Sequence, residues 1–173
     1  MSFRRNIAAV LTILCIAWAG SADAAKRVAL VIGNDTYATL PNLNNGRTDA
    51  KGMAAKLRRL GFDVILRQDA SSRDFGRALE EFEGRLKNAE VGLVFYAGHG
   101  IQVDGNNYLV PSDAKIEVEA DLRYEGIKAD DFLEVMERAG TPLNIVILDA
   151  CRDNPLPRRT RSAARGLTVP VIP

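Results

Sequence analysis

The sequence predicts a three-layer α/β/α sandwich around a mostly parallel β-sheet, because apolar strand-like runs alternate with amphipathic helical segments along its 173 residues. The segments at 26–33, 91–100 and 143–148 are largely apolar, which is typical of strands covered on both faces. Hydrophobic residues make up 47% and charged residues 26% of the chain, which is ordinary for a globular domain. The net charge of +1 gives no reason to expect nucleic acid or an anionic membrane as a partner.

The first 24 residues have the pattern of a secretory signal peptide. Arg4 and Arg5 precede an apolar run at 7–19, and small residues at 22–24 supply a cleavage site before Ala25. A retained membrane anchor is the alternative, but this run is shorter than the roughly 20 apolar residues that span a bilayer. We therefore expect a periplasmic or secreted mature protein that has no membrane attachment.

The first helix of the mature chain is expected to begin at Thr48 or Asp49, because both residue types cap helix N-termini. Apolar residues then recur at helical spacing as far as Leu60. Gly61 supplies the left-handed turn with which many helices end. The apolar residues at 62–66 predict a second strand directly after this turn.

The second helix is expected to follow a cap at Ser71 or Ser72. Its apolar face is formed by Phe75, Leu79, Phe82 and Leu86. Beyond the central strand, an Asp-Gly-Asn-Asn turn predicts a small hairpin within 101–111. The segment 113–126 is charged and irregular, and a third helix is expected at about 129–139, before the last core strand.

Two residues that can support nucleophilic catalysis follow two of the predicted strands. His99, the only histidine, ends the run at 91–100, and Cys151 lies just beyond the strand at 143–148. If these strands are parallel neighbours, their carboxyl ends lie about 5 Å apart, at the edge where open α/β sheets bind ligands. A thiol needs a nearby base to become the thiolate that attacks carbonyl carbons. Each residue alone has an ordinary structural interpretation, but together they predict a Cys-His hydrolase.

The segments around these residues resemble the caspase superfamily, and more closely its metacaspase and bacterial caspase-like branch. The resemblance is carried by Phe-Tyr-Ala-Gly-His-Gly at 95–100, Asp-Ala-Cys-Arg at 149–152 and the opening strand at 29–34. It extends from Arg27 to about Arg165, and the histidine precedes the cysteine by about 50 residues, as in the caspase signature. It implies a caspase-like fold with a catalytic domain at 25–155, followed by a basic linker and the start of a small-subunit region at 156–173.

The resemblance also implies a role for each residue of the site. Cys151 is the nucleophile and His99 the general acid/base, and the backbone N–H groups of Gly100 and Cys151 form the oxyanion hole. Asp149 stands where caspases carry glutamine, and with Asp49 it matches the acidic S1 pocket of metacaspases. We therefore expect cleavage after arginine or lysine in protein or peptide substrates. For Asp49, a helix-capping role is an equally good interpretation.

No cofactor and no metal site is expected, because one histidine and one mature cysteine do not complete a zinc site. Calcium dependence, which many metacaspases have, is the alternative. The available oxygen ligands are Asp113, Asp121, Asp130 and Asp131, for which helix capping is the simpler interpretation. Only seven residues follow Gly166, whereas family members usually continue with a small-subunit region, so such a region supplied in trans is a further expected partner.

Two other functional classes remain open. A non-catalytic caspase-like module that binds proteins or a second subunit would keep the fold without the reaction. A thioesterase-like hydrolase of small acyl compounds would use the same Cys-His pair. The basic linker, with Arg158, Arg159, Arg161 and Arg165, is either a site of self-cleavage or a solvated segment with no further role.

Overall fold

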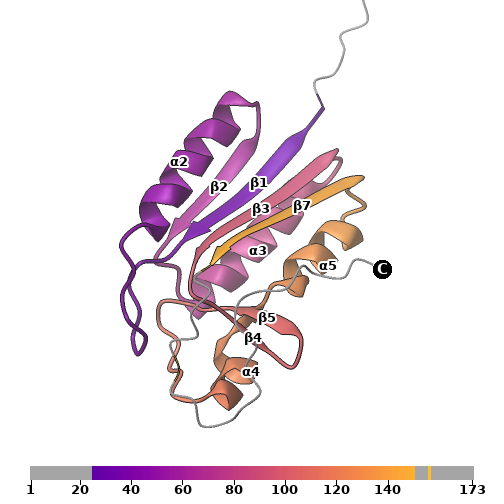
Figure 1. Ribbon diagram of the computed structural model, residues 1–173. Helices are drawn as coiled ribbons and strands as arrows, with labels where there is room; N and C mark the ends of the chain where they lie inside the picture. Colours follow the sequence, from indigo (N-terminus) through magenta and orange to yellow (C-terminus); the bar gives the residue numbers. More distant parts are fainter. Residues whose placement is uncertain (1–24, 151–155, 157–173) are drawn as a thin grey trace, which may run out of the picture.

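The computed structural model describes residues 25–150 and Leu156 (Figure 1). Its main sheet consists of four parallel strands in the order β2-β1-β3-β7. These strands are β1 (Arg27–Gly33), β2 (Asp63–Gln68), β3 (Val91–Gly98) and β7 (Leu143–Ala150). The parallel sheet of the sequence-based prediction is therefore confirmed, and each strand lies within two residues of its expected ends.

Three helices cover the two faces of this sheet, which completes the three layers (Figure 1). Helix α2 (Gly46–Arg59) packs on one face, and helices α3 (Ser72–Leu86) and α5 (Asp130–Arg138) pack on the other. Alternate residues of a strand point to opposite faces, so Val31 contacts the α2 side while Ile32 contacts the α3 side. Every β1 residue after Arg27 is buried, so β1 contributes apolar side chains to the cores on both faces of the sheet.

Helix α3 begins as the sequence predicts. Ser71 is its N-cap, and the Ser71 hydroxyl accepts a hydrogen bond from the backbone N–H of Asp74 while the Asp74 carboxylate accepts one from the backbone N–H of Ser71. Its expected apolar face is also found, with Phe75, Phe82 and Leu86 buried.

Helix α2 begins earlier than expected, at Gly46, so the prediction that Thr48 or Asp49 caps it is wrong. Asn45 occupies the cap position without a side-chain hydrogen bond to the helix. The Asp35 carboxylate, two residues after the end of β1, accepts a hydrogen bond from the backbone N–H of Arg47 instead. Asp49 therefore lies beyond the cap, on the helix itself. A carboxylate distant in sequence replaced the local cap, which a local sequence rule does not detect.

The C-terminal end of α2 does follow the predicted rule. Gly61 has a φ of +80°, its backbone N–H donates to the carbonyl of Arg58, and the N–H of Phe62 donates to the carbonyl of Leu57. This pair of hydrogen bonds is a Schellman motif, which a glycine accommodates because it has no Cβ.

A smaller three-stranded sheet lies beyond the carboxyl ends of β3 and β7 (Figure 1). Strands β4 (Gly100–Val103) and β5 (Asn106–Leu109) form the expected hairpin, and β6 (Ile127–Lys128) pairs with β5. The two residues of the turn, Asp104 and Gly105, have φ values of +49° and +81°, as an Asp-Gly hairpin turn requires.

The segment 113–126, expected to be irregular, contains a short helical stretch. A 3₁₀ turn, η1 (Glu119–Asp121), leads into helix α4 (Leu122–Glu125). The Asp121 carboxylate accepts hydrogen bonds from two backbone N–H groups at its start, and Leu122 is fully buried. No helix in the described part of the chain is long and apolar enough to cross a membrane.

Candidate active site

The carboxyl ends of β3 and β7 lie side by side, as the site prediction requires. In the parallel register of these strands Ala97 is opposite Asp149 and Gly98 is opposite Ala150. The next residue after β3 is His99, and Cys151 is the next residue after β7 but lies outside the described residues. The register therefore brings to one edge of the sheet the two strand ends that precede the predicted catalytic residues.

The imidazole of His99 is buried and held in one orientation. His99 is 4% exposed, and its Nε2 lies 2.8 Å from the carbonyl oxygen of Pro41. A carbonyl oxygen only accepts hydrogen bonds, so Nε2 must carry the proton. In the neutral imidazole Nδ1 is then the basic nitrogen, and this atom is buried without a hydrogen-bond partner among the described residues.

Two tyrosines fix the backbone around His99. The Tyr37 hydroxyl accepts a hydrogen bond from the backbone N–H of His99 at 2.9 Å, and the Tyr96 hydroxyl donates to the carbonyl of His99 at 2.8 Å. The Tyr37 ring also packs against the imidazole, with the ring centroids 4.6 Å apart. Burial lowers the pKa of His99 from its usual 6.5, and the hydrogen bond to Pro41 opposes part of this effect. The imidazole is therefore neutral near pH 7, as a general base must be.

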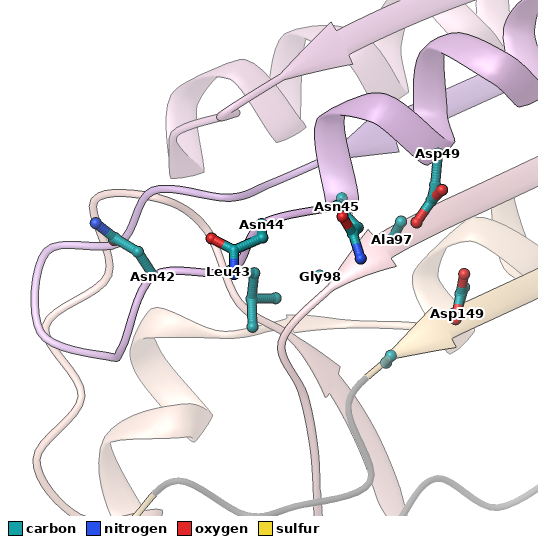
Figure 2. Close-up of a pocket in the computed structure, with 10 residues that line it drawn as sticks. Asn42, Leu43, Asn44, Asn45, Asp49, Ala97, Gly98 and Asp149 are labelled. Atoms are coloured by element: carbon teal, nitrogen blue, oxygen red, sulfur yellow. The ribbon is translucent and has the colours of Figure 1, made fainter.

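A cavity of about 340 Å³ lies at the same edge of the sheet (Figure 2). Both predicted pocket residues, Asp49 and Asp149, line it. In Figure 2, Asp49 points from α2 toward the end of β7, where Asp149 lies. The other lining residues are Asn42, Leu43, Asn44, Asn45, Gly46, Ala97, Gly98 and Ala150. The two carboxylates are both exposed, and they give the cavity a negative charge that suits a cationic group.

Two glycines allow α2 to approach the strand ends closely enough to form this cavity. A Cβ on Gly33 would lie 2.2 Å from the carbonyl oxygen of Gly46, and a Cβ on Gly46 would lie 2.5 Å from the carbonyl oxygen of Asn34. Backbone atoms occupy both positions, so larger residues would push α2 away from β1 and β3. This contact places Asp49 beside the end of β7.

Sequence reasoning missed two residues of the site, Tyr37 and Pro41. Both belong to the polar loop after β1, and both act on His99 across about 60 positions of sequence. The acceptor of Pro41 is a backbone oxygen, which every residue type has, so no motif could have indicated it. Gly100, which the sequence predicts as an oxyanion-hole residue, is buried at the start of β4.

The described residues contain no group of three or more His, Cys, Asp or Glu side chains that could hold a metal ion. Two of the four candidate calcium ligands bind backbone N–H groups instead. Asp113 accepts from Ser72 at the start of α3, and Asp121 caps the turn before α4. These contacts favour the helix-capping interpretation for these two residues.

Comparisons with known proteins show which family this sequence resembles. A family model described as "Caspase domain" matches residues 26–169. Mucosa-associated lymphoid tissue lymphoma translocation protein 1 from Homo sapiens is 33% identical over 129 residues, which are 75% of this chain and 15% of the human protein. Caspase b from Danio rerio is 33% identical over 88 residues, or 49% of this chain and 22% of that protein. The chain thus spans less than a quarter of the length of either relative.

The fold itself is also found among solved structures. Protein GSU0716 from Geobacter sulfurreducens aligns with a TM-score of 0.56 and 18% identity, over 73% of this chain and 50% of that one. This likeness concerns the fold alone. The family match and the human relative concern the sequence, and the range of the family match, residues 26–169, contains both predicted catalytic motifs. On this ground the chain is a member of the caspase family, whose domain is typical of cysteine-peptidase-type hydrolases.

Proposed function

We propose that this protein is an exported cysteine endopeptidase that cleaves proteins after arginine or lysine, with Cys151 as nucleophile and His99 as general acid/base. The observation that carries the proposal is the orientation of His99. Its Nε2–H is bound to Pro41, and the basic Nδ1 has no hydrogen-bond partner among the described residues. His99 directly follows β3, which pairs with β7, the strand that leads to Cys151. A base held in one tautomer next to a thiol is the arrangement that thiol activation needs.

The proposed reaction proceeds through an acyl-enzyme. Nδ1 of His99 takes the proton of the Cys151 thiol, and the thiolate adds to the carbonyl carbon of the scissile bond. The backbone N–H groups of Gly100 and Cys151 stabilise the negative oxygen that forms. The C–N bond then breaks, the leaving amine takes the proton from His99, and a thioester remains. Water, deprotonated by His99, hydrolyses the thioester and restores the thiol.

The carboxylates of the cavity support the proposed specificity. Asp49 and Asp149 line one cavity next to Gly98, the residue before His99. A guanidinium or ammonium group in this cavity would form charge-assisted hydrogen bonds with either carboxylate. A substrate carboxylate would be repelled by the same charges. Asp49 is free for this role because it does not cap α2.

The proposal of export rests on the sequence of residues 1–24, which lie outside the described residues. A signal peptide there would direct the mature protein to the periplasm or out of the cell. N-terminal sequencing of the protein from an exporting host checks this, with Ala25 expected as the first residue. A first residue upstream of the apolar run would contradict it.

The catalytic roles are tested with a fluorogenic peptide that ends in arginine at the cleaved bond. The mature protein, Cys151→Ala and His99→Ala are compared under identical conditions, with Tyr124→Phe as a control because Tyr124 is 89% exposed. Turnover is expected from wild type and the control, and none from the other two. Wild-type turnover in Cys151→Ala or His99→Ala would refute the dyad.

A second candidate function is a non-catalytic module that binds another polypeptide, such as a small-subunit region in trans. Strand β7 ends the sheet order of the described residues and pairs there with β3 alone. Leu143 and Ile147, on the face toward α2, are 51% and 38% exposed. An apolar edge strand is a template for an added strand. Absence of peptide turnover in wild type, together with self-association that Ile147→Lys abolishes in light scattering, would favour this function over the peptidase.

A further inference from the structure

The loop between β1 and α2, residues 34–45, serves two parts of the site at once. The carbonyl of Pro41 fixes the proton of His99, and the following residues, Asn42–Asn45, line the cavity. A displacement of this loop would therefore disturb both the base and the cavity.

Both ends of this loop are joined by an ion-pair cluster, which we call the Arg47 cluster and which consists of Asp35, Arg47 and Asp69. Nε of Arg47 lies 2.9 Å from Oδ2 of Asp35, and Nη1 of Arg47 lies 3.2 Å from Oδ2 of Asp69. Asp35 lies at the start of the loop, and Arg47 is the second residue after its end. One guanidinium therefore binds two carboxylates and closes the loop.

Backbone hydrogen bonds extend this cluster into the loop. Oδ1 of Asp69 accepts the N–H groups of Asp35 and Thr36, and the carbonyl of Asp35 accepts the N–H of Leu43. The Asp35 carboxylate also accepts the backbone N–H of Arg47, at the start of α2. The cluster thus fixes the first residues of the loop, one of its cavity-lining residues and the helix that carries Asp49.

We infer that the Arg47 cluster positions the β1–α2 loop for two purposes. The loop places the Pro41 carbonyl where it holds the Nε2 proton of His99. It also keeps Asn42–Asn45 and Asp49 in place around the cavity. None of the three residues of the cluster lines the cavity or contacts His99, so they are positioning residues rather than catalytic ones. The specificity part of this inference rests on the proposed function. The part that concerns the His99 tautomer does not.

The charges of the cluster explain why a guanidinium is needed. The Asp35 side chain is only 7% exposed, so its charge requires a partner, whereas Arg47 is half exposed and remains hydrated. The planar guanidinium offers separate donors to the two carboxylates, which the single ammonium group of lysine does with poorer geometry. We therefore expect Arg47→Lys to preserve the site only in part.

The first readout of the test needs no catalysis. His99 is the only histidine, so an untagged, ¹⁵N-labelled protein gives one imidazole spectrum in long-range ¹H–¹⁵N correlation. At pH 8 the neutral wild-type ring should show the pattern of an Nε2–H tautomer. The second readout is the ratio of kcat/KM for two matched peptides, one with arginine and one with its neutral isostere citrulline at the cleaved bond.

The decisive variants are Arg47→Gln and the double variant Asp35→Asn/Arg47→Gln. The double variant avoids an unpaired buried carboxylate, so we expect it to stay folded even if Arg47→Gln alone does not. The matched control is Glu81→Gln on α3, because Glu81 bridges two arginines, Arg67 and Arg85, away from the cavity. Circular dichroism verifies that each protein is folded at the temperature of measurement.

We expect the folded double variant to lose the pure Nε2–H pattern and its arginine-to-citrulline ratio to fall at least about fivefold, since small displacements in a site have large kinetic effects. Glu81→Gln should change neither readout. A double variant that keeps either readout would refute the inference, because the cluster would not couple base and cavity. If wild type cleaves neither peptide, the proposed function fails, and the tautomer alone decides the inference.

Discussion

The phenol of Tyr37 joins the ends of two neighbouring strands through its hydrogen bonds. Its oxygen accepts the backbone N–H of His99, after β3, at 2.9 Å, and its own proton is donated to the carbonyl of Asn34, after β1, at 3.1 Å. The ring covers the imidazole as well. Tyr37 therefore fixes where the backbone and the imidazole of His99 lie.

Substitution Tyr37→Phe should reduce both stability and turnover. The variant leaves the buried N–H of His99 without this acceptor, which costs about 1–3 kcal/mol in free energy of unfolding. Urea denaturation measures the loss, and kcat/KM with the arginine peptide should fall with it. Tyr124→Phe, at an exposed position, is the matched control and should be neutral. Equal stability of the two variants would contradict the role given to Tyr37.

Gly98 is predicted to tolerate no side chain. A Cβ there would lie 2.5 Å from the Tyr96 hydroxyl and 2.6 Å from the Tyr37 hydroxyl, and both hydroxyls are bound to the backbone of His99. Gly98→Ala should lower stability by about 1–3 kcal/mol, as overpacking does, and turnover should fall with it. Gly84→Ala on α3, where an added Cβ would meet no atom within 4 Å beyond the neighbouring backbone of its own helix, should instead stabilise by about 0.5–1 kcal/mol. Thermal unfolding of both variants is the measurement.

The buried His99 should make the folded state less stable on mild acidification. Burial lowers its pKa in the folded state below 6.5, while the unfolded chain keeps the ordinary value, so the unfolded state binds more protons between the two values. Stability therefore rises with pH through this interval and is lost as the pH falls below about 6.5. The free energy of unfolding of wild type should decrease more from pH 7.5 to 5.5 than that of His99→Gln. Parallel pH profiles would show that His99 is not desolvated.

The two carboxylates of the cavity should determine the substrate preference. Loss of one charge-assisted contact costs on the order of 1.5–3 kcal/mol, so kcat/KM for the arginine peptide should fall about ten- to a hundredfold in Asp149→Asn and in Asp49→Asn. The value for the citrulline peptide should change little. Matched peptides ending in Arg, Lys and Asp complete the comparison. A preference for Asp, or an unchanged arginine preference in both variants, would mean that another group binds the substrate side chain.

The basic linker at 158–165 lies outside the described residues, and its cleavage stays a prediction from the sequence. Mass spectrometry of purified wild type should show cuts after one of its four arginines, because exposed polar segments are preferred sites of nicking. The same protein with Cys151→Ala should stay intact. An intact wild-type mass under conditions of peptide turnover would argue against self-cleavage.

The sequence by itself determined the parallel sheet, the order of its elements and most of their ends. These features follow from local rules that act on neighbouring residues, such as the apolar run at 91–98, the capping box of Ser71 and the left-handed turn at Gly61. It also indicated Asp49 and Asp149 as neighbours, through the family resemblance. The structure places both in one cavity.

Tertiary structure alone decided how the site is held. The carbonyl of Pro41, the phenol of Tyr37 and the Arg47 cluster all act between segments that are distant in sequence, through atoms whose direction depends on the path of the loop. The start of α2 was likewise decided by contacts outside the helix. Sequence rules favoured a local cap at Thr48 or Asp49, but the helix starts at Gly46, where two glycines pack closely and the Asp35 carboxylate of the preceding loop accepts a backbone N–H. Contacts of this kind form only when the chain is folded, so they leave no periodic or local signal.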